Sequence, residues 1–344
     1  MEPLESTQHT DVYVAKLDAQ GQAVWARQLS CTTCGANPSD GDKAVEALAL
    51  TENAVVVGSF QGDFGSPGPC MDGLCAFPWA PAADPFVVLL ARDGGATLDS
   101  VFTQGTGYTR AMRVVVDSAG DIVVAGIFSN DHDVTPLDPA GGSWLSVGST
   151  DVFVLKLDAA LEPIWHKRLG GVSTDGVAGL ALDQEDNPMV VGHTGDELQG
   201  DSLFVHKLLR DSQVTGGGST LEYPVADRLF DAAPSSSLQP VAAQVDSSGD
   251  LVITATLRGS ASLDGHTLVA AGYSDAVVVK LDQSLATIWA RSVGSDAEDM
   301  GMAMALDAED SIFIGGASGG GVDLGDGPML FGGQLDLFAA ALNP

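Results

Sequence analysis

The sequence predicts an all-β fold built from repeated four-stranded units, and three observations carry this prediction. A segment of the form Asp-Val-Phe-Val-Leu-Lys-Leu-Asp, at residues 151–158, returns along the whole chain. The chain contains 42 glycines and only 6% aromatic residues, and Gly, Asp, Ser and Asn separate short β-branched runs. No stretch shows the spacing of apolar residues that a helix needs, so we expect strands joined by tight turns throughout.

Six copies of the segment set the period. They begin at Asp11, Asp84, Asp151, Asp201, Asp275 and Asp336. A short polar turn follows each copy except the last, and then comes a strand that contains tryptophan at residues 24–29, 164–169 and 288–293. Weaker patterns, at residues 98–102 and around 221–223, take its place in the other two intervals.

A hairpin of two apolar strands precedes each later copy. The clearest example is residues 111–126, in which Asp117-Ser-Ala-Gly120 forms the turn, and residues 241–256 repeat it. Aspartate supplies a side-chain acceptor and glycine tolerates positive φ, as a tight hairpin requires. Residues 44–60, 177–193 and 302–317 carry degenerate versions.

Four short, nearly continuous apolar strands cannot bury both faces alone and must pack on neighbouring copies. Such a unit is a β-propeller blade. We name the hairpin strands A and B, the Lys-Leu strand C and the tryptophan strand D, from the centre outward. The chain then reads C-D, four A-B-C-D units and a final A-B-C.

The combined pattern resembles the bacterial SBBP repeats, which are called seven-bladed β-propeller repeats and occur in secreted proteins and lipoproteins. The matching motifs are Asp-x-Phe-Val-x-Lys-Leu-Asp, the tryptophan strand and Val-Asp-x-x-Gly-Asp-x-Val-Val-x-Gly, from about residue 11 to residue 342. The resemblance implies a propeller with exported, cell-surface or scaffolding roles and implies no catalytic residues. The number of units departs from the family name, since about five fit here.

We therefore expect residues 1–10 as an N-terminal extension and residues 11–344 as one propeller domain of about five blades. In that arrangement residues 11–29 complete the last hairpin, and residues 336–342 are a surplus strand at an edge. A six-bladed, incompletely closed ring and a piece of a longer propeller are the alternatives.

The charge excludes some partners. Fifteen Lys and Arg against 46 Asp and Glu give a net charge of −31, which disfavours nucleic-acid phosphate and anionic membranes. Neutral polysaccharides, basic proteins and cations stay compatible, and the acidity also serves solubility. No apolar window is long enough for membrane insertion, and residues 1–7 lack a secretory signal. We expect an extracellular, cell-surface or periplasmic location, with the export signal outside the sequence given, and leave the oligomeric state open.

Strand order places the A-B and C-D turns at one end of the blades and the B-C and D-A loops at the other. The second end receives nearly all the long, irregular segments, and loops on a rigid scaffold commonly carry binding residues. These segments are residues 30–43, 61–83, 129–150, 230–240, 258–274 and 318–335. We expect a protein or polysaccharide to bind there. The candidates are Phe64, Phe77, Trp79, Trp144 and His132, and each aromatic residue has the alternative role of filling its own loop.

All four cysteines fall in these loops, as Cys31-Thr-Thr-Cys34 and Cys70 to Cys75. Two local pairs in an exported protein favour the disulfides Cys31–Cys34 and Cys70–Cys75, with cross-pairing as the alternative. A four-thiolate zinc site fits less well because four residues separate Cys70 from Cys75. Redox catalysis fits least, because the Gly-Ala-Asn-Pro after Cys34 cannot start the helix that activates a thiolate.

Acidic clusters are the remaining site candidates. Asp131, Asp133 and Asp138 offer oxygen ligands to calcium but lack the spacing of a calcium-binding loop, so turn formation is the favoured interpretation and no cofactor is expected. No catalytic motif occurs. We expect a non-enzymatic binding propeller; a hydrolase or lyase that acts on surface glycans, and a structural module of a longer surface protein, are the alternatives. Lys156 is expected to be an exposed or edge-facing charge.

Overall fold

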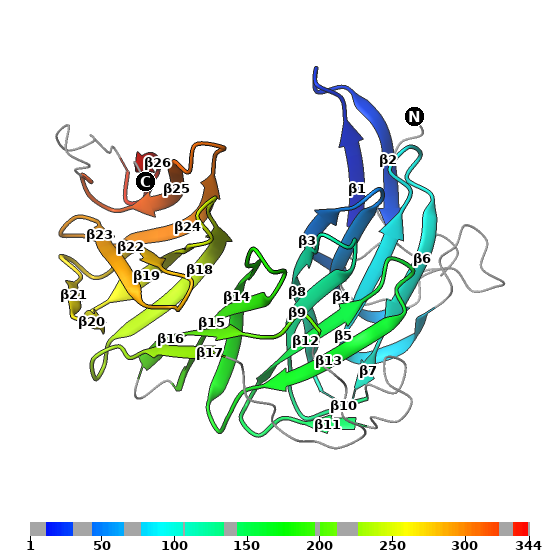
Figure 1. Cartoon of the computed structure of the whole chain (residues 1–344), viewed down its shortest axis with the longest axis horizontal. Helices are drawn as coiled ribbons and strands as arrows, with labels where there is room; N and C mark the ends of the chain where they lie inside the picture. Colours follow the sequence, from blue (N-terminus) through cyan, green and yellow to red (C-terminus); the bar gives the residue numbers. More distant parts are fainter. Residues whose placement is uncertain are drawn as a thin grey trace. The chain divides into compact units, whose positions relative to one another are not determined.

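The expected fold class is confirmed. The computed structural model describes residues 12–29, 43–64, 77–105, 107–133, 143–196, 200–211, 226–322 and 333–342, which form strands and turns and contain no helix. Four sheets have four antiparallel strands each, in the order A-B-C-D that is expected of propeller blades. A C-D pair precedes them and an A-B-C sheet follows them, as the repeat pattern predicts (Figure 1).

The described residues fall into two compact units, one up to Val172 and one from Ser173 on. The single domain expected over residues 11–344 stays a prediction. The first unit starts with the C-D pair β1 (Val12–Leu17) and β2 (Ala23–Leu29). Blade 1 consists of β3 (Lys43–Leu50), β4 (Ala54–Phe64), β5 (Phe77–Leu90) and β6 (Thr97–Phe102). Blade 2 consists of β8 (Thr109–Val116), β9 (Ile122–Phe128), β12 (Asp151–Leu157) and β13 (Pro163–Leu169).

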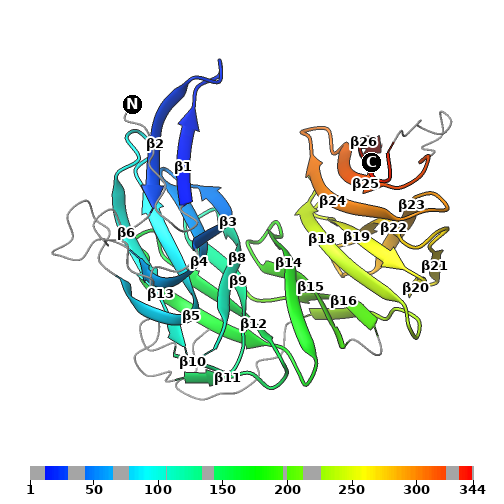
Figure 2. The ribbon, with the colours of Figure 1, turned by 180° about the vertical axis from the view of Figure 1, so that it is seen from behind.

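The second unit continues the series. Blade 3 consists of β14 (Thr174–Leu182), β15 (Pro188–Asp196), β16 (Gly200–Lys207) and β17 (Ala226–Phe230). Blade 4 consists of β18 (Ser237–Val245), β19 (Leu251–Arg258), β22 (Asp275–Leu281) and β23 (Thr287–Val293), seen from behind in Figure 2. The last sheet consists of β24 (Asp299–Leu306), β25 (Ile312–Ser318) and β26 (Asp336–Leu342).

One detail of the predicted ring is wrong. Residues 11–29 were expected to complete the last hairpin, with residues 336–342 as a surplus strand. Instead β26 pairs with β25 from Ile312↔Leu342 to Ser318↔Asp336 and is the C strand of its own sheet. Strand β1 pairs with β2. The sixth copy of the repeat therefore belongs to a sixth, partial sheet, because its register matches that of the other C strands.

The Gly and Phe of the repeat motif have a shared packing role. A Cβ placed on Gly126 in strand B would lie 2.0 Å from the carbonyl oxygen of Arg110 and 2.5 Å from the Phe153 ring. Only glycine leaves room for the Phe153 ring against strand B at this position. The same pairing joins Gly58 to Phe86, Gly192 to Phe204 and Gly316 to Phe338, and blade 4 has the smaller pair Ala255 and Val277.

The Lys of the repeat is a buried ion-pair partner, which corrects the exposed charge expected for Lys156. Lys156 is only 2% exposed, and its Nζ lies 2.8 Å from Asp117 Oδ2 and 3.2 Å from Asp121 Oδ2. Asp117 Oδ1 meanwhile accepts the N–H groups of Ala119 and Asp121. One carboxylate therefore closes the A-B turn and holds strand C. The pair recurs as Lys207 with Asp183 and Lys280 with Asp246.

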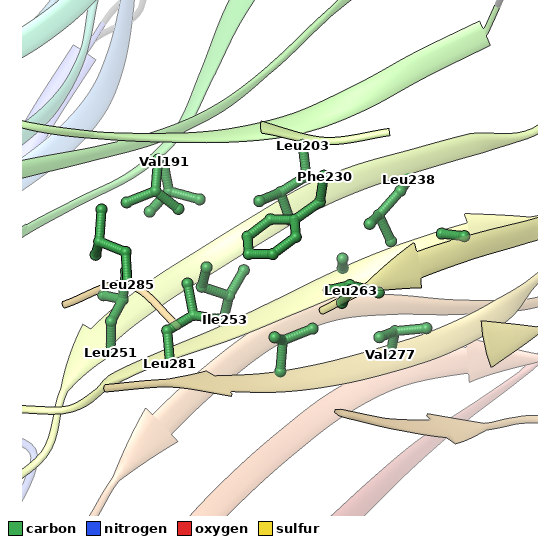
Figure 3. Packing of buried hydrophobic residues seen from close by; sticks show 14 of the residues in the cluster. Val191, Leu203, Phe230, Leu238, Leu251, Ile253, Leu263, Val277, Leu281 and Leu285 are labelled. Carbon is green, nitrogen blue, oxygen red and sulfur yellow. The ribbon is translucent and has the colours of Figure 1, made fainter. Parts of the chain in front are cut away.

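Each sheet packs in a fixed sense on the next. Each sheet has two faces. Within a unit, the forward face points to the next sheet in the chain and carries Val87 and Leu89 in blade 1. The back face points to the preceding sheet and carries Phe153 and Leu155 in blade 2. The forward face of blade 1 packs on the back face of blade 2 in one cluster of buried residues. Blade 3 packs in the same sense on blade 4, where Leu203 of blade 3 shares a buried cluster with Ile253, Val277 and Leu281 of blade 4 (Figure 3).

Candidate functional site

The B-C and D-A connections meet at one end of the blades, which we call the loop end. In the first unit β7 (Gln104–Gly105), part of a D-A connection, pairs with β10 (Asp131–Asp133) of the next B-C connection. In the second unit, Ala232 pairs with Ala261 and Ser274 with Glu298, which again joins a D-A residue to a B-C residue each time. The predicted grouping of these connections is thus confirmed within each unit.

The B-C connections are more regular than the irregular segments expected at residues 61–83, 129–150 and 258–274. In blade 1, strands β4 and β5 continue into the connection and still pair at Phe64↔Phe77. In blade 2, β10 pairs with β11 (Ser143–Leu145), and in blade 4, β20 (Ser260–Leu263) pairs with β21 (His266–Val269). Where the structure describes them, these connections are β-hairpins, and hairpins hold side chains in set positions better than free loops do.

The hairpins of blades 2 and 4 have equivalent registers. Trp144 and Leu268 each lie seven positions before the aspartate that opens strand C, and both are buried. Leu145 and Val269 follow them, and each is 63% exposed. Each hairpin thus uses one side chain to anchor itself to its blade and displays the next one to solvent, because successive residues of a strand point to opposite faces.

Trp144 fills its own hairpin, which is the alternative role considered for it. Its ring centroid lies 5.8 Å from that of Phe128 and 4.8 Å from that of His166. The side chain is 7% exposed and belongs to the core of blade 2. Trp144 therefore packs inside the hairpin next to the exposed Leu145, and a direct role for Trp144 in binding stays a prediction.

The other predicted binding residues are described in their backbone only. Phe64 and Phe77 face each other in the β4–β5 register, and Trp79 lies within β5. His132 stands opposite Trp144 in the β10–β11 hairpin, with Asp131 and Asp133 on either side of it. Their roles in binding stay predictions, as does a calcium-binding role for Asp131 and Asp133.

Two arginine–tyrosine pairs at the loop end were not anticipated from the sequence. In the second unit the Arg258 guanidinium lies 4.7 Å from the ring centroid of Tyr273, which is 62% exposed. In the first unit Arg110 lies 5.8 Å from the ring of Tyr108, which is also exposed. A guanidinium over an aromatic face holds the ring in place and leaves its other face accessible. Nothing in the repeat pattern marks these residues, because the two pairs occupy different strand positions.

The buried carboxylates of the loop end are engaged by the loops themselves. Three of them accept the N–H group of the residue four positions earlier: Asp151 from Val147 at 3.0 Å, Asp275 from Ala271 at 3.1 Å and Asp299 from Ser295 at 2.6 Å. Burial raises the pKa of Asp151, against the N–H groups of Val147 and Gly148 and the charge of Arg168, which lower it. Asp151 is fully buried, so a bound glycan would not reach its carboxyl group. These aspartates shape the loops that precede strands A and C.

The predicted disulfide residues Cys31, Cys34, Cys70 and Cys75 lie outside the described residues, as does Asp138. Within the described part of the chain, no group of three or more His, Cys, Asp and Glu side chains has the arrangement of a metal site. The same part has no helix long and apolar enough to cross a membrane. The two disulfides stay predictions.

Comparisons with known proteins add no family. No family model matches the sequence, and no curated protein is similar to it. Among solved structures, the chain is similar to a quinohemoprotein alcohol dehydrogenase from Comamonas testosteroni, at 11% identity and a TM-score of 0.41 over 88% of this chain and 53% of that one. It is also similar to a mannose phosphorylase from Leishmania mexicana, at 9% identity and a TM-score of 0.38 over 84% of this chain and 82% of that one.

A third similar structure is a bifunctional GH43-CE protein from Bacteroides eggerthii, at 10% identity and a TM-score of 0.35, with 85% of this chain and 33% of that one covered. Similarities of this degree transfer no activity, and the chain's own residues carry the functional argument that follows.

Proposed function

We propose that this chain is a non-enzymatic β-propeller of an exported or cell-surface protein, and that the loop end of its blades binds a protein or a polysaccharide. The observation that carries the proposal is the equivalent display of Leu145 and Val269, each 63% exposed beside a buried anchor. Exposed apolar side chains mark interaction surfaces when they gather into a patch, and Leu145 and Val269 each have a further exposed apolar or aromatic residue nearby in the sequence. Solubility alone gives no reason to hold a large apolar residue outward at the same position twice.

Each unit has neighbouring side chains that extend its part of the surface. Val147 is 49% exposed two residues after Leu145, and Tyr273 is 62% exposed four residues after Val269. Tyrosine combines a large apolar face with a polar tip and is enriched where proteins recognise partners. The apolar pairs favour a protein partner, and the tyrosines Tyr108 and Tyr273 also suit the apolar face of a sugar ring.

The role of the buried aspartates supports binding over glycan hydrolysis. A glycosidase needs two carboxyl groups that reach the scissile bond. Asp151 and Asp299 are fully buried and accept hydrogen bonds from their own loops. In these positions they maintain the shape of the surface.

Substitution at the two ends of the blades tests this function. The variants Leu145→Lys, Val269→Lys and Tyr273→Ser are compared with Leu50→Lys and Leu209→Lys, which change exposed leucines next to the A-B and C-D turns. Binding is measured against a panel of surface polysaccharides and against proteins captured from cell envelopes. We expect the loop-end variants to lose a binding signal that the turn-end controls retain. Equal loss in both sets, or no loss in either, would place the binding surface elsewhere.

A further inference from the structure

The last sheet exposes a large apolar face. Its back face packs on blade 4, since Ile312, Ile314 and Phe338 share a buried cluster with Val252 and Val278 of that blade. Its forward face carries the alternate residues of the same three strands. The exposed ones are Ala303, Ala305, Phe313, Leu337, Ala339 and Ala341. Leu337 is 81% exposed and Phe313 is 45% exposed, although the equivalent residues of blade 1, Pro85 and Val55, are buried.

The described strand positions of this forward face carry no charged residue. Blades 2, 3 and 4 have a lysine in strand C, paired with the aspartate of the A-B turn. In β26 the corresponding position, opposite Phe313 in β25, is Ala341. Ala341 removes the cation that the repeat places on this face, so its exposed strand positions are alanines and two large apolar side chains. The equivalent turn aspartate, Asp307, lies at the A-B end of the sheet. On a chain with a net charge of −31, the middle of this face, away from the A-B turn, is where a second copy meets the least repulsion.

The first sheet of the chain offers a face of the opposite kind. Strands β1 and β2 use Val12, Val14 and Leu29 to pack forward on blade 1. Their back face carries Tyr13, Ala15 and Leu17, with Gln28, Ala26 and Ala23 opposite them in register. Tyr13 is 68% exposed and Leu17 is 57% exposed. This face is also uncharged, and its two large side chains complement the mostly small residues of the β24–β26 forward face.

In the interfaces between blades 1 and 2, between blades 3 and 4, and between blade 4 and the last sheet, a forward face packs on a back face. The two exposed faces are therefore one of each kind. Edge-to-edge pairing of β1 with β25 is ruled out because β26 already occupies that edge. Face-to-face stacking, by contrast, repeats a contact that the chain already makes internally.

We propose that the forward face of β24–β26 binds the back face of β1–β2 of a second copy of this chain, so that the protein associates head to tail. The interface is heterologous, because each copy contributes a different surface. Such contacts continue from copy to copy and produce rings when the rotation closes and filaments when it does not. Leu337 and Phe313 would lie against Tyr13 and Leu17 and exclude water from all four side chains.

Two single variants and their mixture test this inference. Leu337→Lys blocks the forward face, and Tyr13→Lys blocks the back face; both side chains are exposed, so both variants keep the fold. Masses are measured by light scattering and by analytical ultracentrifugation over a range of concentrations. We expect the wild type to form species larger than two chains, and each variant alone to remain a single chain.

The mixture gives the decisive result. A Leu337→Lys chain still has an intact back face, and a Tyr13→Lys chain still has an intact forward face. We expect equal amounts of the two to form a one-to-one dimer and nothing larger. A wild type that stays a single chain at every concentration overturns the proposal. A wild type that forms a dimer also overturns it if the equal mixture of the two variants does not dimerise. Circular dichroism and unfolding midpoints equal to those of the wild type confirm that both variants are folded.

Discussion

The buried pair of Lys156 and Asp117 gives the sharpest test of the structural reasoning. The side chains of Lys156 and Asp117 are 3% and 0% exposed. Lys156→Met keeps the length and apolar stem of the side chain and removes its charge. Asp117 Oδ2 then stays buried without a cation, and breaking one side of a buried pair costs about 3–5 kcal/mol. We expect the free energy of unfolding of this variant to fall by that amount at pH 7.

The repeats supply a graded set of controls. Lys280 makes the same pair in blade 4 with its side chain 13% exposed, whereas Lys16 is 36% exposed and its partner Asp93 is fully exposed. Exposed pairs contribute about 0–1 kcal/mol. The destabilisation should therefore decrease from Lys156→Met through Lys280→Met to Lys16→Met. Denaturant unfolding followed by circular dichroism gives the midpoints, and hydrogen exchange of β9 and β12 shows whether blade 2 opens first.

A double variant and a pH series complete the test. Asp117→Asn keeps an oxygen for the two turn N–H groups, so Asp117→Asn with Lys156→Met should lose less stability than Lys156→Met alone. Burial raises the pKa of Asp117, but the hydrogen bond from Lys156 and the turn N–H groups outweigh it and lower the pKa below its usual value. The wild-type contribution is thus present above about pH 4 and is lost as the pH falls through the lowered pKa.

Below about pH 4 the Lys156→Met variant should therefore approach the wild type in stability, because a neutral Asp117 no longer needs a cation. A Lys156→Met variant as stable as the wild type at pH 7, or a deficit that does not change with pH, would refute the reasoning.

Three further predictions follow from the turns, the blade packing and the cysteines. Leu285 has a φ of 66°, a left-handed backbone conformation that glycine tolerates better than alanine, and its side chain is 1% exposed. In denaturant unfolding, Leu285→Gly should therefore be no less stable than Leu285→Ala, although glycine is ordinarily less stable by about 0.5–1 kcal/mol. Gly126→Ala should destabilise blade 2 by about 2–4 kcal/mol, because the new Cβ meets the Phe153 ring. The double variant with Phe153→Val copies the Ala255 and Val277 pair of blade 4 and should recover part of this loss. No recovery would contradict the role of the ring contact. Alkylation followed by mass measurement should label Cys31, Cys34, Cys70 and Cys75 only after reduction; labelling without reductant would exclude the disulfides.

Much of the loop end could not be predicted from the sequence. The repeat pattern correctly indicated which connections meet there, because strand direction alternates within a blade. It did not reveal that Trp144 is buried and Leu145 exposed, because an apolar pair in a connecting segment has no set orientation until the hairpin register is known. It also gave no signal for the stacking of Arg258 on Tyr273, since these residues are distant in sequence and belong to no repeat motif.

The charge of Lys156 shows a different limit. A lysine that recurs in four of the six copies is ordinarily expected to be solvated, and its burial depends on the A-B turn folding back over the end of strand C. The turn motif Asp117-Ser-Ala-Gly120 and the lysine were both visible, but the 2.8 Å contact between them requires strands A, B and C to be assembled.

The sequence by itself determined the all-β class, the four-stranded unit and the order C-D, four A-B-C-D units and A-B-C, because these depend on local periodicity and turn chemistry that repeat along the chain. Only the tertiary structure decided which edge β26 occupies, which faces are covered and which are exposed. Those outcomes depend on the packing of one sheet on another. The exposed faces of Tyr13 and Leu337 look like ordinary strand positions in the sequence, and what distinguishes them is that no sheet of the described residues packs on them.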